Sequence, residues 1–188
     1  KKANVYAFIK EIGDRAKENQ ITVVGNGSAC VVGGHSYIIK KGQRFISNSA
    51  VASMGYDLPA AIGAYMANLD GKRFDKELIL ITGDGSIQMN LQELQTIVHH
   101  KMDVKIFLIN NEGYHSIRQT QTKFFGDKPL VGIGPDSGDL SFPDMEKLSA
   151  AYGINYISAK TNSELADAVG RAFKAEGPVI CEAFVTKR

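Results

Sequence analysis

Two long apolar runs, each ending in glycine or asparagine, constrain the fold of this chain more than any other feature of its sequence. The first run is ELILITGDG at 77–85, and the second is VKIFLINN at 104–111. Strands that are apolar on both faces are typical of a parallel sheet that helices cover on both sides. The two runs therefore predict a three-layer α/β/α fold with a mainly parallel sheet.

Helical and extended patterns alternate along the rest of the chain, which indicates a six-stranded sheet. Apolar residues at helical spacing predict helices at 4–18, 57–69, 91–102, 142–152 and 165–173. Further strands are predicted at 21–24, 44–50, 155–159 and 178–185. The stretch 112–140 has no clear periodicity, so it is predicted to be irregular and functional or mobile. We expect all of these elements to form one domain that covers residues 1–188.

Three of these helices carry an N-terminal signal in the sequence. Asp57 is expected to cap the second helix, with Pro59 in its first turn. Asn90 and Glu93 have the spacing of a capping box before the third helix. Ser141 is expected to cap the helix at 142–152.

Composition argues against several classes of protein. The net charge is +2 without a basic block, so we expect no nucleic-acid partner. No apolar run reaches the ~18 residues of a membrane span, so we expect no membrane partner. The two cysteines, Cys30 and Cys181, indicate buried free thiols in a reducing compartment, which favours a cytoplasmic location. The chain opens on Lys1 instead of methionine, which favours a piece of a longer protein.

Asp84 is the first candidate for chemistry, because it stands between Gly83 and Gly85 directly after a strand. Glycine allows the backbone to turn sharply and to approach a ligand closely. The amides of Gly85 and Ser86 would then point at an anion. A carboxylate beside an anion is unfavourable unless a cation such as Mg²⁺ lies between them. The other interpretation is a turn with a solvated aspartate.

Asn111 is the second candidate, 27 residues after Asp84. One helix and one strand fill that interval, so the two strands form a right-handed βαβ unit. If the strands are neighbours, the two side chains lie at the same edge of the sheet, where such sheets bind ligands. A carboxylate, an amide oxygen, a backbone carbonyl and diphosphate oxygens would then complete a magnesium shell.

This pattern closely resembles the signature of thiamine diphosphate enzymes. SMGYDLPAAIGA at 53–64 is similar to the matching stretch of acetolactate synthases and related decarboxylases, and GNGS at 25–28 matches their first diphosphate loop. The chain is therefore identified as a member of the acetolactate synthase-like group, covering its C-terminal diphosphate-binding (PP) domain. The resemblance implies the thiamine diphosphate-binding fold, with thiamine diphosphate and Mg²⁺ as cofactors.

The resemblance also implies roles for individual residues. Asp84, the Asn111 side chain and the Gly113 carbonyl would bind Mg²⁺. Met54 would hold the cofactor in a bent shape, although methionine also fills gaps in protein cores. The Ala52 carbonyl would accept the 4′-amino group of the cofactor. The remaining residues expected around the cofactor are Gly27, Ser28, Ala29, Gly83, Gly85, Ser86 and Tyr114.

Residues after the metal loop would face the substrate by the same resemblance. His115 and Gln119 are candidates, and His115 could exchange protons near neutral pH. His115 could equally be a solvated loop histidine. His99 and His100 end a helix, where positive charge is favourable, so a structural role is favoured for both. His35 is left undecided.

One segment departs from the acetolactate synthases. Those enzymes usually carry a tryptophan just after the metal loop, whereas this chain has no tryptophan and reads SIRQTQTKFFGDKPLVG there. The segment looks more like members of the group that are uncharacterised or modify sugars, and the latter add a small acyl unit to a ketosugar. Acetolactate formation, sugar acyl addition and simple decarboxylation therefore all stay open.

Catalysis in this family also needs a glutamate on a separate pyrimidine-binding domain, generally of a partner subunit. The resemblance thus implies a homo-oligomeric carboligase or decarboxylase acting on a 2-oxo acid such as pyruvate, and an isolated chain that is inactive. FAD, if the parent enzyme binds it, would lie mainly on a middle domain. The alternatives are a non-catalytic module for thiamine diphosphate or another diphosphate, and the small subunit of a split decarboxylase. A magnesium-dependent receiver-type domain ranks last, because GNGS lacks the acidic cluster it needs.

Overall fold

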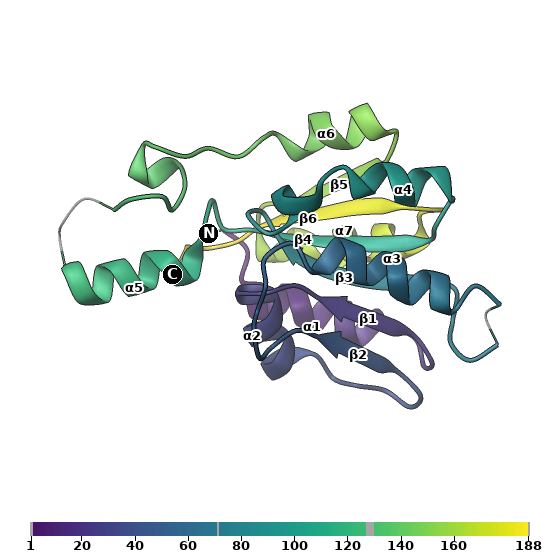
Figure 1. Cartoon of the computed structure of the whole chain (residues 1–188). Coiled ribbons are helices and arrows are strands. Elements are labelled where there is room, and N and C mark those ends of the chain that lie inside the picture. The colour runs from purple at the N-terminus through teal and green to yellow at the C-terminus, as the bar shows by residue number, and fades with distance from the viewer. Residues whose placement is uncertain (1, 71, 127–129, 188) are drawn as a thin grey trace.

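A parallel sheet forms the middle layer of the protein (Figure 1). The computed structural model describes residues 2–70, 72–126 and 130–187. Within them, six strands lie in the order β2-β1-β3-β4-β6-β5, and every neighbouring pair is parallel. The strands are β1 Ile21–Val24, β2 Arg44–Ser47, β3 Leu78–Gly83, β4 Val104–Asn110, β5 Asn155–Ala159 and β6 Val179–Phe184. The predicted six-stranded α/β sheet is confirmed, and it is entirely parallel within these residues.

Helices form the two outer layers. One face of the sheet carries α1 Val5–Arg15, α2 Ser28–Ser36 and α7 Asn162–Lys174. The opposite face carries α3 Asp57–Ala67, α4 Glu93–His99 and α6 Met145–Tyr152. Two short 3₁₀ turns, η1 Ile87–Asn90 and η2 Pro135–Ser137, lie in connections, and α5 His115–Phe125 projects beyond the sheet (Figure 1). Among the described helices, none is both long and apolar enough to cross a bilayer.

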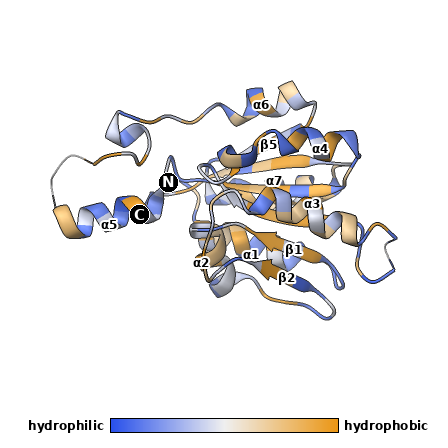
Figure 2. Cartoon of the chain, in the orientation of Figure 1, coloured by the Kyte–Doolittle hydropathy of each residue, from blue (hydrophilic) through white to orange (hydrophobic). Residues whose placement is uncertain are grey.

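The central strands are buried on both faces because successive side chains point to opposite sides. Ile79 and Ile81 of β3 pack into the cluster that contains Phe8 of α1. Leu80, between them, packs into the other cluster with Leu94 of α4. Figure 2 shows these hydrophobic strands between the helical layers. Burial in two separate cores explains why the runs at 77–85 and 104–111 do not alternate.

The structure corrects the starts of three helices. Asp57 is the first helical residue and is fully buried, so Tyr56 takes the cap position instead. Asn90 forms no capping box, because its side chain donates to the Gly55 carbonyl and α4 begins after Gln92. Helix α6 is shorter than 142–152, since the Asp144 carboxylate, and not Ser141, caps it by accepting from the Lys147 amide at 3.1 Å.

Two helices were not predicted. The expectation of an irregular stretch at 112–140 is wrong where α5 and η2 lie, and its residues 127–129 lie outside the described ones. Helix α5 has no fully buried residue among those described, so it lacks the apolar stripe that would have indicated a helix. Helix α2 was missed because Gly33 and Gly34 disfavour helix and its apolar residues occupy no single face.

The strand order places three loops at one edge of the sheet. From β1 the chain moves outward to β2 and then returns to β3 on the other side of β1. The order therefore reverses between β1 and β3, and a crevice forms beyond the carboxyl ends of strands at such a switch point. Loops that follow β1, β3 and β4 meet there, as expected for Asp84 and Asn111.

Candidate functional site

A cavity lies at this carboxyl edge, and it brings together most of the predicted site residues. Those that line it are Gly27, Ser28, Ala29, Met54, Gly83, Asp84, Gly85, Ser86, Asn111, Gly113, Tyr114 and His115. Ala52 and Gln119 are exposed and are not among the lining residues. His35, His99 and His100 are also exposed and lie outside the cavity. Residues from four separate parts of the chain therefore converge on one site.

Asp84 holds the exits of β3 and β4 together. Its Oδ1 accepts from the Gly85 amide at 2.8 Å, and its Oδ2 accepts from the Gly113 amide at 3.0 Å. Its own amide donates to the Ile109 carbonyl at 3.0 Å. Burial raises the pKa of Asp84 to about 6, although the hydrogen bonds from Gly113 and Gly85 oppose this shift. A nearby cation would offset the cost of burying this carboxylate.

Asn111 supplies a buried oxygen that lacks a partner. The side chain is 6% exposed, and its Nδ2 donates weakly to Ser28 Oγ at 3.4 Å. Its Oδ1 accepts no hydrogen bond from any described residue. Such an orphaned acceptor is costly unless a ligand satisfies it. The amide oxygen and the Asp84 carboxylate line one cavity, as the sequence predicted.

The donors at this edge suit a hard cation. Among the described residues, His, Cys, Asp and Glu form no group of three that could hold a metal ion. A cation here would therefore need amide, carbonyl and ligand oxygens besides Asp84. Mg²⁺ is commonly bound in this way, through one or two carboxylates together with phosphate oxygens and water.

The part of the cavity wall at the start of α2 suits an anion. Helix α2 begins at Ser28, and its N-terminal amides lie at the cavity wall. Gly27 precedes it with φ +56°, and a Cβ added there would meet nothing within 4 Å among the described atoms. The positive φ explains the glycine, and the open space leaves room for a ligand. A helix N-terminus of this kind favours negative charge such as phosphate.

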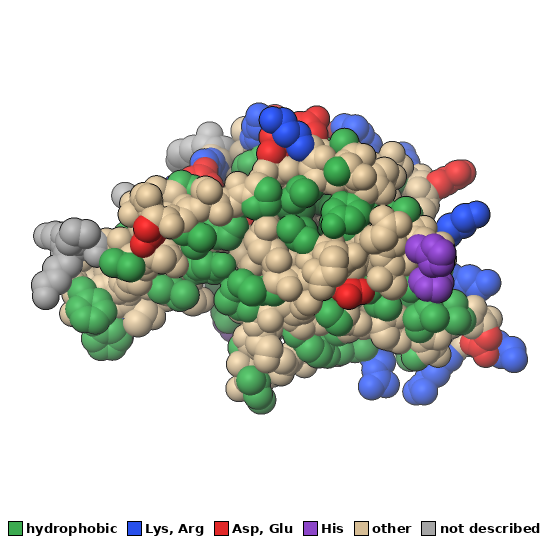
Figure 3. All heavy atoms as spheres, turned by 45° about the horizontal axis from the view of Figure 1, so that its top comes forward, with side chains coloured by type: hydrophobic (Ala, Val, Ile, Leu, Met, Phe, Trp, Pro, Cys, Tyr) green, Lys and Arg blue, Asp and Glu red, His purple; other side chains and the backbone are tan. Residues whose placement is uncertain are grey.

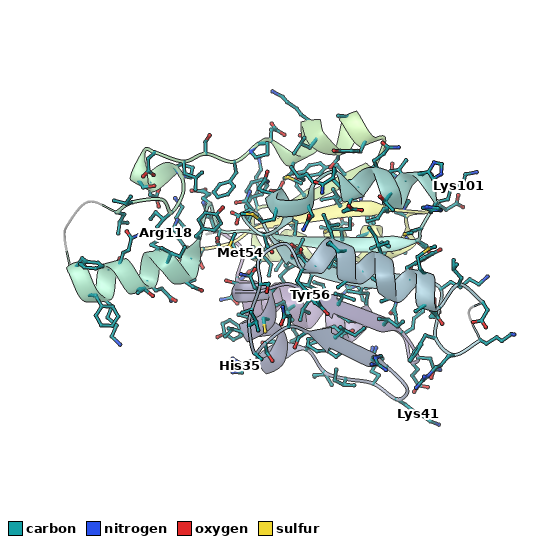
Figure 4. All side chains as sticks on the ribbon, viewed as in Figure 1. His35, Lys41, Met54, Tyr56, Lys101 and Arg118 are labelled. Atoms are coloured by element: carbon teal, nitrogen blue, oxygen red, sulfur yellow. The ribbon has the colours of Figure 1, made fainter. Side chains whose placement is uncertain are left out.

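Met54 belongs to the same cavity. Figure 4 shows it at the carboxyl edge, between Arg118 of α5 and Tyr56 at the start of α3. Met54 is half-buried and lines the cavity, and it is absent from both core clusters of described residues. This placement favours a role at the cavity over the filling of a core gap. Ala52 and Gly55, on either side of it, have φ values of +53° and +77°.

Tyr114 and His115 close the cavity on the side of α5. The Tyr114 ring packs edge-on against Phe142 with ring centroids 5.6 Å apart, and burial followed by the Asp84 charge raises the Tyr114 pKa. His115 opens α5, and burial followed by the Arg118 charge lowers its pKa. Its Nδ1 is buried without a described partner. A neutral imidazole near pH 7 follows, which can accept or donate a proton.

Four lining residues were missed from the sequence: Asn26, Ile109, Ser116 and Ile117. Asn26 lies inside the GNGS loop, and Ile109 lies two positions before Asn111, so proximity to known motifs could have indicated both. Ser116 and Ile117 belong to α5, which carried no helical signal. The error in secondary structure therefore became an error in the site.

Comparison with known proteins gives a family for this geometry. Residues 25–183 match the family model described as "Thiamine pyrophosphate enzyme, C-terminal TPP binding domain". The match begins at the loop after β1 and ends in β6, so it contains all of the lining residues.

Relatives of known name point the same way. The acetolactate synthase large subunit of Cyanidium caldarium is 39% identical over 142 residues, which are 76% of this chain and 23% of that protein. The chloroplastic acetolactate synthase of Arabidopsis thaliana is 31% identical over 176 residues, 93% of this chain and 26% of that protein. Benzoylformate decarboxylase from Polynucleobacter necessarius shares the fold, with a TM-score of 0.81, 23% identity, and coverage of 97% of this chain and 33% of the other. The chain thus spans about a quarter of the length of these synthases.

Proposed function

Because this chain belongs to the thiamine pyrophosphate enzymes, as an acetolactate synthase-like C-terminal TPP-binding domain, we propose that its carboxyl-edge cavity holds the diphosphate of thiamine diphosphate through one Mg²⁺. The observation that carries this proposal is the pairing of a buried carboxylate with an unsatisfied amide oxygen, Asp84 with Asn111 Oδ1. A cation would offset the cost of burying the Asp84 carboxylate and would give Asn111 Oδ1 a partner.

Three protein oxygens would bind the cation: a carboxylate oxygen of Asp84, Asn111 Oδ1 and the Gly113 carbonyl. The metal loop is shaped for this role by its backbone. Gly113 has φ +135°, and a Cβ there would lie 1.9 Å from the Ile133 carbonyl oxygen, so another residue would not fit. Glu112, just before it, also has a positive φ of +57°. Strained backbone of this kind is often held at functional sites.

The diphosphate would lie between the cation and the amides at the start of α2. Ser28 and Ser86 line this part of the cavity and can donate hydroxyl protons to phosphate oxygens. Gly27, Ala29, Gly83 and Gly85 keep the wall free of bulky side chains. Positive helix-end amides and a divalent cation would neutralise the diphosphate from two sides.

The rest of the cofactor would extend past Met54 and Tyr114. Met54 would support its bent shape, and the Ala52 carbonyl, although outside the cavity wall, would accept from the 4′-amino group. Thiamine diphosphate would supply a nucleophilic carbon that adds to the carbonyl group of a 2-oxo acid and a cationic ring that accepts the electron pair released when CO₂ leaves. His115 would hold or move a proton beside the substrate, and Gln119 would contribute from the exposed side of α5.

The activity of the whole protein is part of the proposal. We infer a carboligase or decarboxylase, a transferase or lyase, that decarboxylates a 2-oxo acid such as pyruvate and passes on or releases the remaining unit. A pyrimidine-binding domain with the activating glutamate, in the same protein or a separate subunit, would complete the site within a homo-oligomer. FAD, if present, would lie mainly outside this chain. Two free thiols, Cys30 and the buried Cys181, support a reducing compartment such as the cytoplasm.

The second candidate is a module that binds thiamine diphosphate or another diphosphate without turnover. The anion-binding features at α2 would serve that function equally well. The two candidates separate when the complete protein, carrying the glutamate domain, is supplied with thiamine diphosphate, Mg²⁺ and pyruvate. CO₂ release supports the enzyme, and binding without release supports the module.

The site itself is tested by replacing Asp84. We expect Asp84→Ala to abolish Mg²⁺-dependent binding of thiamine diphosphate in calorimetry and to leave the circular dichroism spectrum unchanged. Asp70→Ala, which removes an exposed acid outside the cavity, is the matched control and should bind as the unmodified chain does. Equal affinity of the Asp84→Ala variant and the unmodified chain would refute the proposed cation site.

A further inference from the structure

The segment that carries Met54 is attached to the turn after β3 through the backbone of one residue, Gly55. The Gly55 amide donates to Ser86 Oγ at 3.0 Å, and Asn90 Nδ2 donates to the Gly55 carbonyl at 2.6 Å. Both polar groups of one residue are therefore held by side chains from the segment 86–90. This segment begins two residues after Asp84, so the same turn carries the proposed cation ligand.

The two hydrogen bonds at Gly55, here called the clamp, leave no room for a side chain at this position. The φ of Gly55 is +77°, and a Cβ there would lie 2.5 Å from Met89 Cβ and 2.8 Å from Asn90 Nδ2. Such close approach of the Met89 and Asn90 side chains, together with the positive φ, requires glycine. The adjacent residue, Met54, thereby receives a fixed position relative to the cavity.

A second attachment lies two residues further along. Asp57 is fully buried, and Thr82 Oγ1 at the end of β3 donates to its Oδ2. Its Oδ1 accepts from the Leu58 amide at 3.0 Å. A Cβ on Gly25 would lie 2.5 Å from Asp57 Oδ2, so this carboxylate also fits closely against the loop after β1. The segment that follows Met54 is thus attached to the exits of both β1 and β3.

From these contacts we propose that Asn90 is a positioning residue, which fixes Met54 over the cofactor cavity through the Gly55 carbonyl, with the Asp57–Thr82 pair as a second anchor. The sequence had given Asn90 only a helix-capping role. Ser86 connects the Gly55 backbone to the proposed diphosphate site. Its hydroxyl oxygen accepts from the Gly55 amide, and its hydroxyl proton stays available for a phosphate oxygen. The inference rests on the proposed function for the identity of the ligand, but the clamp itself does not need a ligand.

Methyl NMR of the chain labelled at its five methionine methyl groups tests the clamp without cofactor. Asn90→Asp replaces the donating amide by a carboxylate that repels the Gly55 carbonyl. We expect the Met54 methyl signal to shift or broaden in this variant. Met102 and Met145, both buried in the core far along the chain, should keep their signals and so report an intact fold. If N90D does not fold, Asn90→Ala, which removes the donor without adding charge, takes its place.

Asn68→Asp is the matched control. Asn68 Nδ2 likewise donates to backbone carbonyls, of Phe74 and Asp75, at 3.1 and 3.0 Å, but outside the cavity. Its loss should leave the Met54 signal in place. If Asn90 only stabilised the fold, N90D would also leave the Met54 signal in place. Comparison of N90D with N68D therefore distinguishes positioning of Met54 from a general loss of stability.

Titration of the same samples with Mg²⁺ and thiamine diphosphate then tests the role of the clamp. We expect roughly tenfold weaker binding by N90D, since a buried hydrogen bond is lost and its partner left unsatisfied, and unchanged binding by N68D. A folded N90D variant with an unmoved Met54 signal overturns the clamp. A moved signal with unchanged affinity overturns its role in cofactor binding. Absence of binding by the unmodified chain refutes the proposed function instead, while the cofactor-free spectra still decide on the clamp.

Discussion

At the scale of single residues, the site is defined by groups whose surroundings are incomplete. Asp84 is ionised at neutral pH although burial raises its pKa to about 6, and Asn111 Oδ1 has no described partner. Each of these groups costs folding free energy in the absence of a ligand. The same groups would give the proposed ligand part of its binding free energy, so that stability and the proposed function would oppose each other here.

The Asp84 carboxyl makes the stability of the metal-free chain depend on pH. Its pKa is about 6 in the folded state against an ordinary value of 3.8, so between those values the folded chain holds a proton that the unfolded chain has lost. Folding stability should therefore fall as pH rises from about 4 to about 6, and this contribution should be constant above that. Two pH units correspond to up to about 3 kcal/mol.

Urea unfolding in EDTA at a series of pH values measures this effect. Asp84→Asn is the control, because an amide cannot titrate in this range. The difference in unfolding free energy between the two proteins should change between about pH 4 and about pH 6, because the unmodified chain becomes less stable relative to Asp84→Asn as pH rises. A difference in unfolding free energy that stays constant with pH would contradict the raised pKa of Asp84.

At the scale of elements, the sequence predicted the strands and helices whose apolar side chains form a pattern buried in a core. Strands β3 and β4 were recognised because both of their faces enter a core, and α7 because Leu165, Val169 and Ala172 form a buried stripe. The meeting of Asp84 with Asn111 followed from the same reasoning, since β3 and β4 are neighbours. Sequence pattern and tertiary structure agree for these elements, because each buries one or both of its faces; α2 is the exception, since it buries Ala29 and Val32 without an apolar stripe in its sequence.

Elements that bury no apolar stripe, and side chains whose contacts lie far away in the sequence, could not be predicted in this way. Helix α5 packs no buried residue, so periodicity had nothing to indicate. The Asn90 side chain bonds to Gly55, 35 residues earlier, in place of the local cap that its spacing suggested. The fit of Gly85 against Tyr114, whose ring atom would lie 2.2 Å from a Cβ, likewise depends on distant residues. Contacts between loops that are far apart in sequence leave no local pattern.

Helix α5 should be the least protected helix of the isolated chain. Figure 3 shows hydrophobic side chains exposed on the projecting part of the molecule. The exposed large hydrophobic residues of α5 and of the segment after it are Ile117, Phe124, Phe125 and Val131. Opening a helix that buries so little apolar surface costs little free energy. We expect its amides to exchange with deuterium faster than those of α3, by mass spectrometry at neutral pH. Equal protection of α3 and α5 would show that α5 is held by more than these contacts.

At the scale of the whole molecule, the chain supplies a rigid sheet edge and one part of a proposed active site. It spans 23% of the length of the Cyanidium caldarium synthase subunit. Two core clusters of described residues pack against the two faces of the sheet. The chemistry of the proposed enzyme would require the activating glutamate of a pyrimidine-binding domain.

Activity should therefore require complementation. With Mg²⁺, thiamine diphosphate and pyruvate, we expect the isolated chain to release no CO₂ above the buffer rate. Addition of a matching pyrimidine-binding domain should start release, and the same domain with its activating glutamate changed to glutamine is the control. Release by the isolated chain would contradict the proposed division of the site.

The position of α5 has a consequence for how this protein can evolve. The helix borders the site through His115, Ser116 and Ile117, yet neither core cluster contains any of its described residues. We expect mutations at its exposed positions to leave both core clusters intact. Arg118 is the exception, because it donates to the Glu112 carbonyl, next to Asn111, at 2.9 Å. A directed-evolution library restricted to the exposed positions of α5 should therefore retain a high fraction of folded variants.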